Sequence, residues 1–91
     1  MTEFTNHKIE YLVNANGNKI ANCVVVRVNG QIYFWSYDTC CACVDEDRNL
    51  HRFTTWRTNT TSKQLNTFFY QYHVENMDSK KFYELPVEVL E

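Results

Sequence analysis

The side chains with the most reactive chemistry gather in the middle of the chain, where three of its four cysteines occupy four consecutive positions. Cys40, Cys41 and Cys43 could supply thiolates to zinc or an iron-sulfur cluster, with Cys23 and His51 completing the ligand set. Structural zinc sites usually contain two separated ligand pairs, and this run lacks that spacing. In a regular strand, Cys41 and Cys43 would share one face and Cys40 the other. We therefore expect buried thiols, with no metal and no cofactor.

Histidine and acidic side chains raise the question of nucleophilic catalysis. His51 and His73, with Asp38 or a cysteine, are the available groups, and a thiolate nucleophile needs a base within hydrogen-bond reach. The sequence contains no nucleophile elbow, phosphate-binding glycine loop or metalloprotease helix. Its two glycines both follow asparagine in turn-like segments. We predict that the protein is not an enzyme.

Aromatic and basic residues form the third candidate site. Strand faces that combine rings with arginines stack the bases of single-stranded nucleic acid, and the same residue types anchor protein interfaces. The formal net charge of -2 argues against attraction to a phosphate backbone. Rings at strand positions are also typical of a core or of cross-strand pairs. The predicted partner-binding residues are Tyr33, Trp35, Tyr37, Arg52, Trp56 and Arg57.

The elements that must position these side chains begin with two hairpins. Asn-Gly pairs at Gly17 and Gly30 predict turns of type I′, in which both central residues have positive φ. Four to five strands are expected, at about residues 8–13, 19–28, 31–37, 40–44 and 50–56. A bulge or bend is expected at residues 36–39. Val24, Val26 and Val28 share one face of the second strand, which we expect to be buried.

A helix is expected at about residues 61–75, followed by a short strand at about 81–85. Thr61 and Gln64 have the spacing of a capping box, and an apolar stripe follows at helical spacing. This stripe consists of Leu65, Phe68, Phe69 and Tyr72. The predicted fold is therefore α+β, an antiparallel meander with one helix packed over the valine face.

Length and composition fit one small globular domain. With 91 residues and 44% hydrophobic side chains, the chain can bury a modest core, so we expect a single domain over 1–91 with frayed ends at 1–6 and 87–91. The first residues lack the basic start and apolar run of a secretory signal, and no apolar stretch reaches membrane-spanning length. We expect a cytoplasmic protein with reduced cysteines and no membrane partner.

Two segments carry a resemblance to a known group of proteins. Ser36-Tyr37-Asp38-Thr39 precedes Cys41-Ala42, and Thr58-Asn-Thr-Thr-Ser-Lys-Gln-Leu-Asn66 follows Trp56. This pattern resembles a family of small uncharacterised proteins, encoded largely by bacteriophages and related mobile elements. In that family an S-Y-x-T-P-hydrophobic-A strand precedes an S-x-T-T-S-K-H-hydrophobic-N helix start. Cys40 stands where the family often has proline, and Gln64 where it often has histidine.

The resemblance implies a phage origin and carries no established activity. Small phage proteins without catalytic motifs commonly bind and block a host protein, often a defence component, as anti-CRISPR proteins do. We therefore expect an inhibitor of a host protein, acting in the host cytoplasm. One alternative is a nucleic-acid-binding module on the aromatic sheet face, favoured if the rings are exposed and flanked by arginines. The other is a self-assembling phage component that dimerises through an unpaired edge strand.

Overall fold

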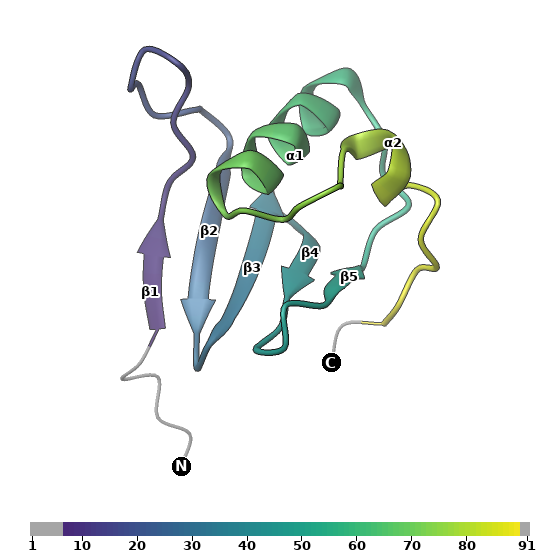
Figure 1. Cartoon of the computed structure of the whole chain (residues 1–91). Helices are drawn as coiled ribbons and strands as arrows, with labels where there is room; N and C mark the ends of the chain where they lie inside the picture. The colour runs from purple at the N-terminus through teal and green to yellow at the C-terminus, as the bar shows by residue number, and fades with distance from the viewer. Residues whose placement is uncertain (1–6, 90–91) are drawn as a thin grey trace.

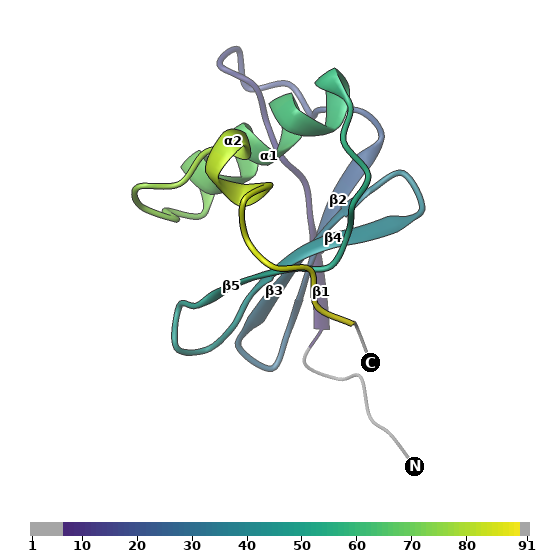
Figure 2. The same cartoon turned by 90° about the vertical axis from the view of Figure 1, so that its right-hand side faces the viewer.

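The computed structural model describes residues 7–89 and contains a five-stranded antiparallel sheet with two helices. The strands lie side by side in chain order: β1 (His7–Glu10), β2 (Cys23–Val28), β3 (Gln31–Ser36), β4 (Thr39–Val44) and β5 (Leu50–Arg52). The helices are α1 (Asn59–Gln71) and α2 (Ser79–Phe82). Figures 1 and 2 show both helices on the same side of the sheet. The predicted α+β meander is confirmed. Of the ends predicted to fray, at 1–6 and 87–91, residues 1–6 and 90–91 lie outside the described residues.

The β2–β3 turn has the predicted geometry. Asn29 has a φ of 50° and Gly30 a φ of 84°, as a two-residue type I′ turn requires. The Asn16-Gly17 turn is different, because positive φ is confined to Gly17 there. The Asn14 side chain closes that turn by accepting hydrogen bonds from the backbone N–H groups of residues 16 and 18. The first Asn-Gly pair therefore forms a wider loop than predicted.

That wider loop shortens the two strands beside it. β1 ends at Glu10 rather than at residue 13, and β2 begins at Cys23 rather than at residue 19. Between them only one isolated bridge remains, from Val13 to Lys19. The Gln71 side chain of α1 bonds the outward-facing backbone groups of this segment, accepting from Val13 N–H and donating to the Tyr11 carbonyl. The helix thus anchors the outer side of the segment that follows β1.

The hydrophobic core lies between α1 and one face of the sheet. Val25, Phe34 and Ala42 are neighbours in register across β2, β3 and β4, and all three are fully buried. The Phe34 ring stacks on Phe68 of α1, with centroids 5.1 Å apart. The helix therefore covers the face that carries Val25.

The expectation that α1 covers Val24, Val26 and Val28 is wrong. These valines lie on the opposite face and are only partly buried. The alternating side-chain pattern of β2 predicted that these valines are buried, because the other face of the strand contains the charged residue Arg27. Arg27 is accommodated near the edge of the sheet, where it donates to the Glu10 carboxylate.

A bulge in β4 changes the predicted arrangement of the cysteines. Phe34 is opposite Ala42, but the next residue, Trp35, is opposite Cys40, so Cys41 is the extra residue. Cys40 and Cys43 consequently share the face of Trp35, and Cys41 joins the core. The prediction that Cys41 and Cys43 share a face is wrong because a bulge reverses the alternation. A bulge or tight bend was expected at residues 36–39, and the structure has a two-residue turn there.

Helix α1 begins two residues before the prediction and ends four residues before it. Its N-cap is Thr58, whose hydroxyl oxygen accepts the Thr61 N–H at 3.0 Å. The predicted capping box of Thr61 and Gln64 is wrong, because both side chains are buried inside the protein. The preceding strand ends at Arg52 rather than at residue 56, which leaves a connecting segment before the cap.

The segment after α1 forms the short helix α2 instead of the predicted strand at 81–85. Asp78 caps this helix by accepting the Lys81 N–H at 2.8 Å, and Phe82 is fully buried against the core. The chain then returns to the sheet, where Val87 forms a parallel bridge with Arg52. The Glu88 N–H donates to the Arg52 carbonyl at 2.7 Å. The C-terminal segment therefore covers the outer edge of β5.

Candidate functional site

The side of the sheet opposite the helices is largely apolar in its centre, and we call it the open face. Cross-strand register places its residues in rows, with Trp35 between Val24 and Cys40, and Tyr33 between Val26 and Cys43. The apolar residues of the open face are Ile9, Val24, Val26, Val28, Tyr33, Trp35, Cys40 and Cys43, and the polar residues His7, Gln31 and His51 lie at its ends. A sheet with one face on the core usually presents polar side chains on the other. This one presents valines and large rings, which is typical of a binding surface.

Exposure varies systematically across the open face. Ile9 on the edge strand is 54% exposed, the valines and the two rings are partly buried, and the two cysteines are buried. Tyr33 makes a 2.6 Å hydrogen bond from its hydroxyl to the side chain of Gln31 on the same strand, which fixes the position of the ring. The side chains of the open face are thus buried on β4 and become more exposed to solvent toward β1.

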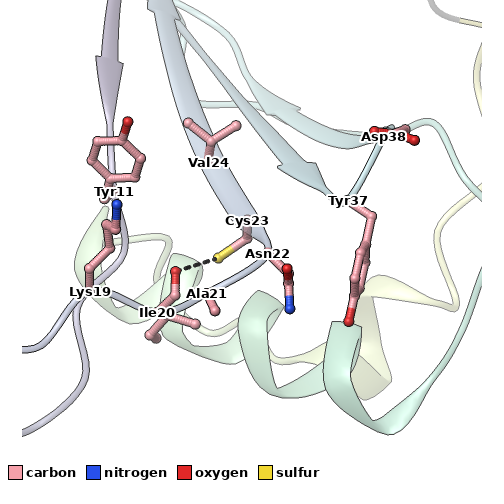
Figure 3. A pocket seen from close by; sticks show the side chains of 9 residues that line it. All are labelled: Tyr11, Lys19, Ile20, Ala21, Asn22, Cys23, Val24, Tyr37 and Asp38. Carbon is pink, nitrogen blue, oxygen red and sulfur yellow. Dashed lines mark hydrogen bonds between the residues drawn. The ribbon is translucent and has the colours of Figure 1, made fainter.

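A shallow groove continues the open face at one end of the strands. Figure 3 shows Tyr11 with Lys19 on one side of this groove and Tyr37 with Asp38 on the other, with Val24 between them. The Lys19 ammonium lies 4.4 Å from the centre of the Tyr11 ring. Tyr11 and Tyr37 are 47% and 57% exposed. The groove therefore adds two accessible rings and one charge of each sign to the apolar surface.

Tyr37 is held in an unusual backbone conformation at this groove. Its φ is 54°, and its N–H donates at 2.8 Å to the carbonyl of Asn22, which has a φ of 66°. A bulky residue with positive φ is strained, and such strain persists where the surrounding structure enforces it. The strand pairing thus presents the Tyr37 side chain at the end of the open face.

The predicted partner-binding residues separate into two groups. Tyr33 and Trp35 lie on the open face, and Tyr37 lies at its end. Arg52 is on the helix side, where its guanidinium donates to the carbonyls of Tyr83 and Leu85. Arg57 stacks on the ring of Tyr83, 4.9 Å from its centre. Trp56 is 57% exposed beside the same residue, since its carbonyl accepts the Tyr83 hydroxyl. The two arginines and Trp56 therefore surround Tyr83 and do not flank the open-face rings.

Arginines are absent from the open face as a whole. Arg27 and Arg52 lie on the helix side, and Arg48 donates to the carbonyls of Tyr72 and His73 near the end of α1. Arg57 is the stacked residue beside Tyr83. Each arginine of the chain thus has a partner within the protein, away from the open-face rings.

The cysteines are poor nucleophiles and poor ligands in this arrangement. All four are free and buried. Burial raises the pKa of the Cys40 thiol to about 12 and that of Cys41 to about 11, and it also raises the pKa of Cys43. Within residues 7–89, no group of three or more His, Cys, Asp or Glu side chains could hold a metal ion.

His51 is opposite Cys43 in the register of β4 and β5, but both of its ring nitrogens are bonded to carboxylates. Its Nε2 is 2.7 Å from Asp45 Oδ2, and its Nδ1 is 2.9 Å from Glu88 Oε2. These hydrogen bonds, first that with Asp45 and then that with Glu88, raise the pKa of His51. Since both ring nitrogens donate to carboxylates, the imidazolium is the stabilised form, which is unsuited to act as a base. His51 instead ties the β4–β5 turn to the C-terminal segment.

Residues from the two motif segments, 36–39 and 58–66, meet in the interior between β3 and α1. Ser36 Oγ donates to Gln64 Oε1 at 2.7 Å and lies 3.2 Å from Thr61 Oγ1. Gln64 Nε2 donates to the Ala21 carbonyl at 3.2 Å. All three side chains are at most 3% exposed. In this chain the motif therefore holds the helix on the sheet and does not form a surface site.

The open face contains residues that sequence analysis did not include in the binding set. These residues are Ile9 and the three valines of β2. The valines were left out because they were expected to face the core. Large rings on both faces of β3 were the available signal that both faces of the sheet are apolar. Among the described residues, neither helix combines the length and the apolar character that crossing a membrane requires.

Comparisons with known proteins identify a family but not an activity. No protein of curated function and no solved structure matches the chain. The model of a family of unknown function, DUF8033, matches residues 7–84, a range that includes all five strands and both helices. Since this range is most of the chain, the protein belongs to the family of unknown function DUF8033.

Proposed function

We propose that the protein acts by binding another protein through the open face, and that it thereby blocks a bacterial host protein. The observation that carries this proposal is the uncovered layer of valines and rings on the side of the sheet away from α1. Apolar surface of this kind is stabilised when a partner removes it from water. The partner is a protein surface with an apolar centre that contacts Trp35 and Tyr33.

The charges around the open face favour protein over nucleic acid. Nucleic-acid-binding sheets place cations beside the stacking rings, whereas the arginines here are bonded elsewhere. The Asp45 and Glu88 carboxylates lie at one end of the face, bonded to His51. With a net charge of -2 for the chain, these groups add repulsion toward phosphate.

A blocking role fits the resemblance to phage proteins and the state of the reactive side chains within residues 7–89. His51 is bonded to two carboxylates, and the cysteine thiols are buried with raised pKa values. An inhibitor needs only an interface, and a few central aromatic residues typically contribute most of the binding energy. Trp35 is the residue expected to have this role, because it lies between Val24 and Cys40 near the accessible groove.

The test compares two tryptophan variants as baits in a bacterial lysate treated with nuclease. Trp35→Ser removes a ring from the open face, and Trp56→Ser is the matched control, because Trp56 is an exposed tryptophan near Tyr83. Circular dichroism and thermal unfolding check that both variants fold. A partner captured by the wild type is then purified, and its affinity for each variant is measured.

The proposal predicts that Trp35→Ser weakens binding of the purified partner about thirtyfold or more, as loss of a central hot-spot residue does. Trp56→Ser should bind within about threefold of the wild type. The wild type should also lower the partner's own activity. Equal binding by both variants, or recovery of nucleic acid alone from an untreated lysate, would contradict the proposal.

A further inference from the structure

The two edges of the sheet are treated differently by the fold. The C-terminal segment covers the outer side of β5 through the Val87–Arg52 bridge and the Glu88 N–H. β1 pairs with β2 on one side, and no described strand pairs with its other side, where the Gln71 side chain bonds the Tyr11 carbonyl and the Val13 N–H beyond the end of the strand. An edge of this kind is a template for another strand, and natural proteins normally protect it.

The register of the sheet fixes which backbone groups of β1 point outward. The Tyr37 N–H donates to the Asn22 carbonyl, so residues 22, 24, 26 and 28 direct their backbone groups toward β3. The alternate residues Val25 and Arg27 therefore bond β1, opposite Glu10 and Lys8. Ile9, opposite Val26, is in a non-hydrogen-bonded position, so its N–H and C=O point away from the sheet.

The side chains around Ile9 are self-complementary. Lys8 and Glu10 lie on the helix side of β1, and Ile9 lies on the open face with 54% exposure. If a second β1 runs antiparallel with its Ile9 opposite this one, each Lys8 is opposite a Glu10 of the other copy. Directly opposed charges of unlike sign stabilise a strand pair, and like charges destabilise it.

We propose that two copies of the protein pair antiparallel along β1, about a two-fold axis that passes between their Ile9 residues. The two Ile9 backbones exchange a pair of N–H to C=O hydrogen bonds, and their side chains meet on the open face. Two Lys8–Glu10 pairs, one on each side of the axis, fix the register. Two five-stranded sheets thus become one sheet with a continuous apolar face.

The charges near this junction are compatible with the pairing. Glu10 accepts the Tyr72 hydroxyl at 2.6 Å and Arg27 at 3.3 Å, and these contacts lower its pKa. It therefore stays ionised at neutral pH. The Lys8 side chain is 72% exposed and only 3.6 Å from Glu10 of its own chain, so it can turn toward the second copy. The pairing does not depend on the proposed function, because it leaves Trp35 and Tyr33 accessible.

The experiment measures self-association of three variants by sedimentation equilibrium of the full chain. Ile9→Pro removes the outward N–H while leaving the hydrogen bonds of β1 to β2 in place. Lys8→Glu places a carboxylate at position 8 opposite Glu10 of the second copy. This repulsive contact occurs twice in the dimer. Lys63→Glu is the matched control, with the same charge change at an exposed position of α1.

The wild type and Lys63→Glu should form dimers with the same dissociation constant. Lys8→Glu should raise that constant about tenfold, because the contact occurs twice, and Ile9→Pro should be monomeric. The Ile9 amide of the wild type should also exchange with deuterium more slowly as protein concentration rises. A wild type that is monomeric at millimolar concentration would overturn the proposal. So would a dimer that persists unchanged in Lys8→Glu and Ile9→Pro, since it would use another surface.

Discussion

A double-mutant cycle on Ser36 and Gln64 tests how the helix is held on the sheet. Ser36 on β3 donates to Gln64 on α1 at 2.7 Å, and both side chains are at most 3% exposed. Ser36→Ala removes the donor, and Gln64→Met replaces the amide with an unbranched apolar chain of similar length. These single changes leave a buried polar group without its partner, which is costly in a protein interior.

The magnitudes follow from the hydrogen bonds that each change removes. Ser36→Ala leaves the Gln64 side-chain oxygen without a donor and should lower the free energy of unfolding by about 2 kcal/mol. Gln64→Met also frees the Ala21 carbonyl and should cost about 2 kcal/mol. The double variant removes both partners together, so its cost should be about 2.5 kcal/mol, which gives a coupling energy of about 1.5 kcal/mol.

Urea unfolding, followed by tryptophan fluorescence, supplies the four free energies of this cycle. Equal slopes with denaturant across the four proteins would show that the variants unfold from comparably compact states. Additive effects, with a coupling energy near zero, would refute the assignment of these motif residues to a shared interior network. A large coupling would support it.

Three further predictions concern the turn, the histidine and the helix cap. Gly30→Val should lower the free energy of unfolding by about 2–3 kcal/mol, because valine strongly disfavours a φ of 84°; near-wild-type thermal stability would count against this. The pKa of His51 is raised, so its stabilising effect is complete below its unfolded value of 6.5 and is lost as pH rises through the folded pKa. His51→Gln should thus lower stability most below about pH 6 and progressively less as the pH rises above that, and a pH-independent difference in urea midpoints would contradict this. Thr58→Ala should cost about 1 kcal/mol through loss of the N-cap, and an unchanged melting temperature would show that another group caps α1.

The sequence correctly predicted those elements whose conformation is determined by residues close together along the chain. The Asn29-Gly30 turn follows from the positive φ that a two-residue hairpin demands, and α1 follows from its apolar stripe. The short helix α2 also had a local signal, the Asp78 cap with a buried Phe82, which was assigned to a loop and a strand instead. Short segments of this kind are where strand and helix patterns are hardest to separate.

Nonlocal contacts decided the features that sequence patterns misassigned. Which face of β2 is covered depends on where α1 packs, and Phe68 stacks on Phe34 from the side that contains Arg27. The bulge at Cys41 reverses the alternation in β4, and nothing in the cysteine run distinguishes it from a regular strand. The candidate site was therefore predicted in part. Tyr33 and Trp35 were chosen from their type, whereas the valines around them were assigned to the core.

Photo-cross-linking from position 35 in bacterial cells tests the central claim most directly. A benzophenone amino acid in place of Trp35 lies on the open face, and the same replacement of Trp56 provides the control near Tyr83. The proposed function predicts that irradiation joins position 35 to one host protein and that position 56 gives no such product. A cross-link from position 56 alone, or a product at position 35 that nuclease removes, would contradict a protein-binding open face.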